Sequence, residues 1–139
     1  MQLEWSGVLL LLIGNSLWDL HSRSICLWFT GLLTGEGLVL SLLSGRQPHS
    51  LLPAILPGLV LFGLSLLSSG AIGGGDGIVI GAMGVFLDLG SILWCCMFAF
   101  GFCALPAAFL FLTKRSGQAS LPFLPFLLLG SIVTGFWIR

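Results

Sequence analysis

The sequence predicts an all-α fold, namely a polytopic membrane protein with about six transmembrane helices. Two observations support this prediction: charged residues are scarce, and long apolar segments recur from one end of the chain to the other. Of the 139 residues, 57% are hydrophobic and only 7% are charged, and the mean hydropathy is +1.12. A soluble domain carries roughly a quarter of its residues as charged side chains. A chain this apolar is suited to apolar surroundings, and the hydrocarbon core of a lipid bilayer provides them.

Polar residues divide the chain into six apolar segments, each predicted to form one helix. A helix needs about 20 mostly apolar residues to cross a bilayer, and about 17 suffice. The predicted helices cover residues 3–18, 25–43, 51–67, 78–90, 91–113 and 121–138. The fourth and fifth together span about 35 residues, so one of them is short, and a re-entrant pair stays open as an alternative. No linker or low-complexity stretch separates the segments, so residues 1–139 are predicted to form a single transmembrane domain.

The distribution of charge limits the partners and predicts an orientation. The formal net charge is zero, whereas nucleic-acid-binding chains are basic, so the predicted partner is the lipid bilayer and not a nucleic acid. Six crossings put residues 19–24, 70–77 and 114–120 on one side of the membrane, and this side carries three of the five Lys and Arg residues. Because short cytoplasmic loops are enriched in Lys and Arg, we expect this side of a cell-membrane protein to face the cytoplasm.

The cysteine pattern argues against a metal site. A structural zinc site needs two close cysteine pairs in a watery loop. The four cysteines here, Cys26, Cys95, Cys96 and Cys103, lie in predicted apolar helices, and the only neighbours are adjacent in sequence. We therefore expect buried free thiols that pack as small apolar groups, and we predict no metal and no organic cofactor.

Two aspartates are the main candidates for chemistry, since ionisable residues near a bilayer are costly and tend to be kept for a reason. Asp19 follows the first predicted helix and Asp76 lies between the third and fourth, so helix counting puts both on one side at similar depth. If the first and fourth helices pack together, the two carboxyls meet. Two carboxylates that share a water suit peptide-bond hydrolysis, because one keeps a proton while the other activates the water. Taken alone, each is more often a solvated helix cap.

A glycine run precedes the second aspartate in the stretch Gly73-Gly74-Gly75-Asp76. Glycines there lack side chains, take positive φ readily and admit an extended peptide beside the carboxyl. A phosphate cradle is a poor alternative, because the run lacks the Lys-Ser/Thr of a P-loop and Asp76 would repel phosphate. A plain flexible turn is the other alternative.

Three stretches in order resemble the type IV prepilin peptidases, which are intramembrane aspartic proteases with a Gly-x-Gly-Asp motif. Residues 19–25 resemble the first catalytic segment of the family, an Asp followed by a short basic stretch. Residues 73–76 match the second catalytic segment, and Leu-Pro-Phe-Leu-Pro-Phe-Leu at 121–127 is similar to the Ile-Pro-Phe-Gly-Pro-Phe-Leu signature of the last helix. The order and approximate spacing agree over nearly the whole chain.

The chain departs from the family pattern at four positions. Cys26 and Leu27 stand where the family usually has Pro and Asn. Ile78 stands where a Lys commonly follows the second Asp, and Leu124 replaces a usual Gly. These departures concern substrate preference and efficiency more than the carboxylate pair.

The resemblance implies an aspartic-type endopeptidase with Asp19 and Asp76 as catalytic residues and a substrate cleft shaped by the backbone of Gly73, Gly74 and Gly75. It implies that the substrate is a pilin-like precursor, whose short basic leader is removed on the cytoplasmic side just before a hydrophobic N-terminal helix. Longer relatives carry a further domain that methylates the new N-terminus. We expect a short form with peptidase activity alone.

Two further residues are accessory candidates, and a second class of function stays open. Glu36 lies between two glycines within the second predicted helix, where it is either functional or a protonated, hydrogen-bonded structural residue. Arg23 either orients the leader or is a solvated loop residue. The alternative function is a non-catalytic membrane component that binds a pilin helix or moves ions or protons through Asp19, Glu36 and Asp76. Carriers often contain an internal repeat, and this sequence has none of convincing period.

Overall fold

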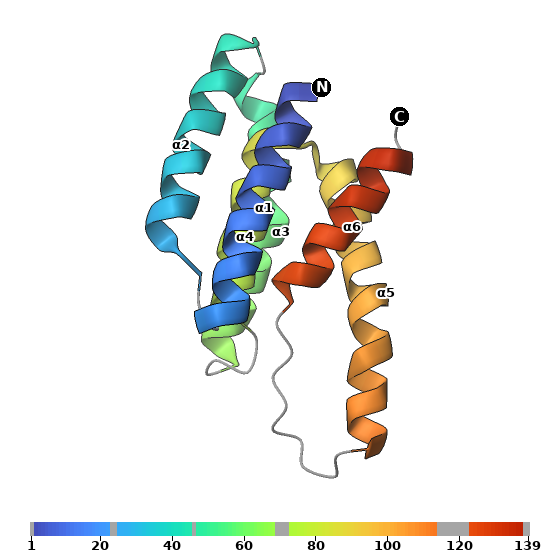
Figure 1. Cartoon of the computed structure of the whole chain (residues 1–139). Helices are drawn as coiled ribbons and strands as arrows, with labels where there is room; N and C mark the ends of the chain where they lie inside the picture. The colour runs from blue at the N-terminus through green and yellow to red at the C-terminus, as the bar shows by residue number, and fades with distance from the viewer. Residues whose placement is uncertain (1, 23–24, 46, 69–72, 114–122, 138–139) are drawn as a thin grey trace.

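The computed structural model describes residues 2–22, 25–45, 47–68, 73–113 and 123–137. Within these residues the chain forms six α-helices and no β-strand, which confirms the all-α prediction for this part of the chain (Figure 1). The helices are α1 (Gln2–Ser22), α2 (Leu27–Leu43), α3 (Pro48–Leu67), α4 (Gly74–Phe86), α5 (Leu89–Thr113) and α6 (Leu124–Trp137).

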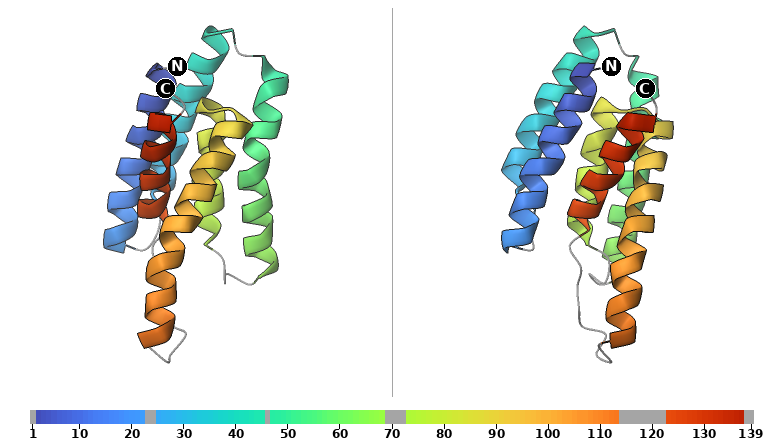
Figure 2. Two further views of the ribbon diagram at one scale, coloured as in Figure 1. Left: turned by 90° about the vertical axis from the view of Figure 1, so that its right-hand side faces the viewer. Right: turned by 45° about the vertical axis from the view of Figure 1, so that its right-hand side comes forward.

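The helices run alternately up and down the bundle. The ends of α1, α3 and α5 and the starts of α2, α4 and α6 point toward one end, while the start of α1 and the end of α6 lie at the other (Figures 1 and 2). The second half of α5 extends beyond the other helices at the first of these ends (Figure 2). Helix counting from the sequence therefore predicted correctly that Asp19 and Asp76 belong to one end of the bundle.

Helix α1 is longer than predicted, because its polar end does not interrupt the helix. The apolar segment stops at Trp18, yet the helix continues through Asp19 to Ser22. Polar side chains at the end of a helix remain compatible with helical backbone when they reach solvent, and His21 and Ser22 are both exposed. As a result Asp19 is held on regular helix and not on a loop.

Helix α4 is displaced toward the N-terminus relative to the prediction, covering Gly74–Phe86 in place of 78–90. Its first turn contains Asp76, and acidic residues are common in the first turn of a helix. It ends early because Asp88 caps α5 instead: the amide of Ser91 donates to Oδ2 of Asp88 at 3.2 Å, and its hydroxyl donates to Oδ1 at 2.6 Å. With 13 residues, α4 is the short member of its pair.

The same short helix lies at the centre of the bundle, in contact with α1, α2, α3 and α5. Its packing against α3 is closest, because glycines bring the two backbones together. A Cβ on Gly77 would lie 2.7 Å from the backbone nitrogen of Phe62, and one on Gly84 would lie 2.5 Å from the carbonyl oxygen of Ala54. Small residues that admit close backbone approach are typical of helix pairs in membranes.

Two helices are long and apolar enough to cross a membrane, and their apolar side chains face outward. Only 22% of the span His49–Leu67 in α3 and 17% of the span Leu89–Phe109 in α5 is buried. Leu67 is 84% exposed and Leu105 is 73% exposed. A core helix of a soluble protein would bury such side chains, since exposing them to water costs about 1.5–3 kcal/mol each. Helices α2, α4 and α6 are equally apolar in character but shorter.

Candidate active site

Asp19 and Asp76 come from different helices and lie at the same end of the bundle. Asp19 is in the last turn of α1 and Asp76 in the first turn of α4, and these two helices are in contact (Figure 1). Burial raises the pKa of Asp76 to about 6, with a further contribution from the negative charge of Asp19. Burial also raises the pKa of Asp19. The two carboxyls are thus close enough to influence each other electrostatically, although 57 positions separate them in the sequence.

Gly73 supports the carboxyl of Asp76 directly. The backbone amide of Asp76 donates to the carbonyl oxygen of Gly73 at 3.1 Å. A Cβ on residue 73 would lie 2.8 Å from Oδ2 of Asp76, so the carboxyl folds back over a space that only glycine leaves open. Gly73 does not use the freedom of glycine to take positive φ, since its φ is −62°. Among the described residues the positive-φ glycine is Gly45, so the run is needed for close approach.

The rest of the glycine run is packed from two sides. A Cβ on Gly75 would lie 3.0 Å from Cγ2 of Ile25, and one on Gly74 would lie 3.1 Å from Oγ of Ser65. Ile25 ends the stretch that resembles the first catalytic segment, whereas Ser65 is a buried residue of α3. The two aspartate-bearing stretches, 19–25 and 73–76, therefore lie against each other in the fold.

Ser65 and Cys103 join this neighbourhood although no sequence motif marks them. Cys103 in α5 lies near enough to Asp76 to interact with its charge. The four cysteines are free thiols, as predicted, but Cys103 and Cys26 are only partly buried, whereas Cys95 and Cys96 are fully packed. A sequence signal for this contact does not exist, because α5 is apolar around its whole circumference and shows no inward face.

Glu36 does not join the pair. It lies in the middle of α2 with its side chain exposed, while Thr30, Gly37 and Ser41 form the buried face of that helix. The flanking glycines behave differently from each other: the ring of Phe86 lies against Gly37, whereas Gly35 faces open space.

Several sequence predictions concern residues outside the described part of the chain. Arg23 is one of them, as are the four other Lys and Arg residues on which the orientation depends. The first two residues of the third family-like stretch, 121–122, also lie outside it. Of the remainder, Leu124 and Leu127 are fully buried, and the Phe123 ring lies 5.1 Å from that of Phe100 in α5.

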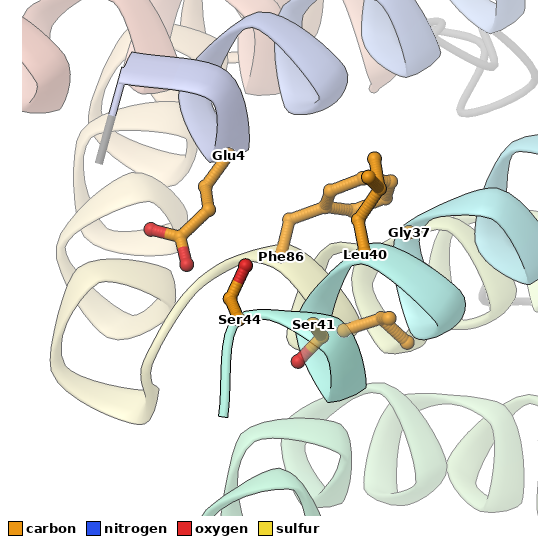
Figure 3. A pocket seen from close by; sticks show the side chains of 7 residues that line it. Glu4, Gly37, Leu40, Ser41, Ser44 and Phe86 are labelled. Atoms are coloured by element: carbon orange, nitrogen blue, oxygen red, sulfur yellow. The ribbon is translucent and has the colours of Figure 1, made fainter. Parts of the chain in front are cut away.

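A small cavity lies at the opposite end of the bundle and is separate from the aspartates. It has a volume of about 30 Å³, and its lining residues are Glu4, Gly37, Leu40, Ser41, Ser44, Val85 and Phe86. The Ser44 hydroxyl points toward Glu4, whereas the Ser41 hydroxyl points away from it (Figure 3). Within the described residues the buried Ser41 hydroxyl has no hydrogen-bond partner. A cavity of this size holds one or two water molecules and no organic ligand.

The chemistry of the site is that of a carboxyl pair. No three His, Cys, Asp or Glu side chains of the described residues gather in one place. No protein-family model matches the chain, and no curated protein or solved structure matches it either. Function is therefore argued from the residues of the site, since fold class alone does not imply activity.

Proposed function

We propose that this protein is an intramembrane aspartic endopeptidase of the prepilin-peptidase type. The observation that carries the proposal is the placement of Asp19 and Asp76 at the same end of the contacting helices α1 and α4, where the charge of Asp19 adds to burial in raising the pKa of Asp76. An isolated helix cap has no such neighbour. The glycine run that packs against Asp76, and the contact of Gly75 with Ile25, bring backbone without side chains close to this carboxyl.

We further propose that all six helices cross the cell membrane and that the acid pair faces the cytoplasm. The outward-facing apolar side chains of α3 and α5 support membrane insertion. Close backbone packing of α3 on α4 through glycines supports the same conclusion. The majority of Lys and Arg on the Asp19 side supports the orientation.

In the proposed reaction the pair holds one proton. Burial acts more strongly on Asp76 and raises its pKa to about 6, so Asp76 is assigned the proton and Asp19 the charge. Asp19 takes a proton from water as the water oxygen bonds to the scissile carbonyl carbon, and Asp76 gives its proton to the carbonyl oxygen. Asp19 then passes its proton to the amide nitrogen, the C–N bond breaks, and the new carboxylic acid returns a proton to Asp76. No metal or cofactor takes part.

The proposed substrate is a pilin-like precursor, cut between a short leader and a hydrophobic helix. An open apolar depression on α2, lined by Leu27, Trp28, Gly31 and Leu32, supports a helical apolar partner. It begins two residues after Ile25, which contacts Gly75. The Trp28 side chain is 90% exposed there.

A cleavage assay in membranes tests this proposal. The protein is co-expressed with a panel of pilin-like precursors, and leader removal is followed by a gel shift. Asp19→Asn and Asp76→Asn should each lower the cleavage rate by at least about 100-fold, which is the contribution expected of a general acid or base. Both variants must still insert into the membrane. Wild-type protein that cuts none of the precursors, or a variant that cuts as fast as wild type, contradicts the proposal.

Glu36→Gln is the matched control and also separates the alternative function. A protease should tolerate this change, because Glu36 is exposed on the outer side of α2. A carrier that moves ions or protons through Asp19, Glu36 and Asp76 should be sensitive to it. The outward position of Glu36 gives this alternative less support than the protease.

A further inference from the structure

A buried polar pair links α1 to α2 one helical turn from Asp19. Asn15 is 0% exposed and Thr30 is 2% exposed. The Thr30 hydroxyl donates to Oδ1 of Asn15 at 2.9 Å, and Nδ2 of Asn15 donates to the carbonyl oxygen of Leu11 at 3.0 Å. Buried polar side chains are costly unless their hydrogen bonds are satisfied. The bond between Asn15 and Thr30 therefore holds the two helices in one arrangement.

This bond connects the two sides of the candidate active site. Asn15 precedes Asp19 by four residues, so the two side chains lie on the same face of α1. Thr30 lies in the first turn of α2, where its amide donates to the carbonyl oxygen of Cys26 at 2.9 Å. The preceding residue, Ile25, contacts Gly75 next to Asp76. The hydrogen bond thus joins the helix that carries Asp19 to the segment that packs against Asp76.

We propose that Asn15 and Thr30 are positioning residues, whose hydrogen bond sets the place of Asp19 relative to Asp76 and so the sharing of a proton between them. The catalytic consequence rests on the proposed function, whereas the effect on the carboxyl pair does not. Other contacts hold α1 in the bundle: the ring of Phe86 lies against Gly7, and that of Trp5 lies against Gly135. The ring of Phe29 also lies against Gly14, so loss of the polar pair should shift the Asp19 end without detaching or unfolding α1.

Burial is the larger cause of the raised pKa of Asp76 and the charge of Asp19 the second, so loss of the Asp19 contribution should lower that pKa. On α1 the other titratable residues are His21, beside Asp19, and Glu4, at the opposite end of the helix, and Cys26 precedes the start of α2. Cys103 on α5 lies near enough to Asp76 to interact with its charge. The described part of α6 contains no titratable residue, and α3 contains only His49, at the opposite end of the bundle.

The test is a carboxyl titration by ¹³C NMR on aspartate-labelled protein in lipid nanodiscs. Asp76 is assigned by its absence in Asp76→Asn. Asn15→Leu and Thr30→Val keep side-chain volume and remove the hydrogen bond. Asp19 is then free to turn away, so the pKa of Asp76 should fall below its wild-type value of about 6. Thr30→Ser, which keeps the hydroxyl, should restore the wild-type titration.

A matched control separates this effect from general loosening of the bundle. Thr134 in α6 is as buried as Thr30, and its hydroxyl donates to the carbonyl oxygen of Gly130 within its own helix at 2.7 Å. Thr134→Val should leave Asp76 unchanged. If Asn15→Leu does not fold, the pKa of Asp76 in Thr30→Val, compared with that in Thr30→Ser, still tests the proposal. Wild-type titration of Asp76 in Thr30→Val overturns the proposal.

Cleavage measurements then separate this proposal from the proposed function. Asn15→Leu and Thr30→Val should lower kcat by up to about 100-fold with little change in KM, because misplacement of a catalytic group acts on the chemical step. If the titration shifts as expected but wild-type protein cuts no precursor, the positioning role stands and the peptidase function fails. If wild type cuts and Thr30→Val cuts and titrates like it, the positioning role alone fails.

Discussion

At the scale of single residues, the contact between Gly73 and Asp76 gives the site its shape. The backbone of Gly73 has ordinary dihedral angles, with φ at −62° and ψ at 108°. An alanine at residue 73 could therefore adopt the same dihedral angles. Its Cβ, however, would lie only 2.8 Å from Oδ2 of Asp76.

Gly73→Ala is accordingly expected to displace the carboxyl of Asp76 and to lower cleavage by about 10- to 100-fold. The Gly63→Ala variant is the control, since a Cβ on Gly63 meets no atom within 4 Å. Initial rates of leader removal measure both. Equal rates for Gly73→Ala and wild type would show that the close contact has no catalytic role.

The raised pKa of Asp76 predicts how cleavage depends on pH. In the proposed mechanism Asp76 must carry a proton, which it loses as the pH rises through about 6. The cleavage rate should therefore fall on the alkaline side of that value. Glu36→Gln leaves Asp19 and Asp76 intact, so its cleavage rate should fall over the same pH range as that of wild type. A rate that stays constant from about pH 5 to about pH 8 contradicts the assignment of the proton to Asp76.

The same shift predicts how Asp76 affects stability. Because its folded-state pKa is raised above 3.8, the contribution of Asp76 to stability is fully present below that pH and is lost as pH rises through about 6. Asp76→Asn, which stays neutral, should therefore unfold at a higher temperature than wild type at about pH 8 and not at about pH 4. Thermal unfolding in detergent at both pH values measures this. A variant less stable than wild type at the higher pH would contradict the burial of an ionised carboxyl.

At the scale of the helices, the closest packing is between α3 and α4. Gly84 lies against the backbone of Ala54 and Ile55, with no room for a side chain. This contact between α3 and α4 sets the orientation of α4, and so the direction in which Asp76 points at its start. Phe86, at the other end of α4, fits its ring against Gly7 of α1 and Gly37 of α2.

Gly84→Ala should push α3 and α4 apart and destabilise the fold by about 1–3 kcal/mol, the usual cost of overpacking. Gly63→Ala, at an open position of α3, should be neutral or stabilising by up to about 1 kcal/mol, because alanine favours helix more than glycine does. Unfolding in detergent by increasing denaturant measures the difference. Equal stability of the two variants would mean that the α3–α4 contact accommodates the added methyl group without loss of unfolding free energy.

At the scale of the whole molecule, alternation of the helices places the start of α1 and the end of α6 at the end opposite the aspartates (Figure 1). If all six helices cross the membrane, reporter fusions after residue 45 and after residue 137 should report the same, extracytoplasmic side. Fusions after residue 22 should report the cytoplasm. A cytoplasmic signal after residue 137 would mean an odd number of crossings.

The sequence by itself determined the helical class, the approximate spans and the two aspartates as candidates. These features are local, because a run of apolar residues predicts a helix wherever it lies, and an Asp before Ser91 caps α5 through its own neighbours. The early start of α4 was missed, since hydropathy finds the apolar residues from Ile78 onward but not the first helical turn at Gly74.

Only the tertiary structure decided which side chains meet. Helices that are apolar all round carry no pattern that marks their inward face, so the rotation of each helix depends on packing with its neighbours. Packing turned Glu36 outward, brought Cys103 toward Asp76, and joined Asn15 to Thr30. It also brought Asp19 and Asp76 to one end of the bundle through contact between α1 and α4, which are separated by two intervening helices in the sequence.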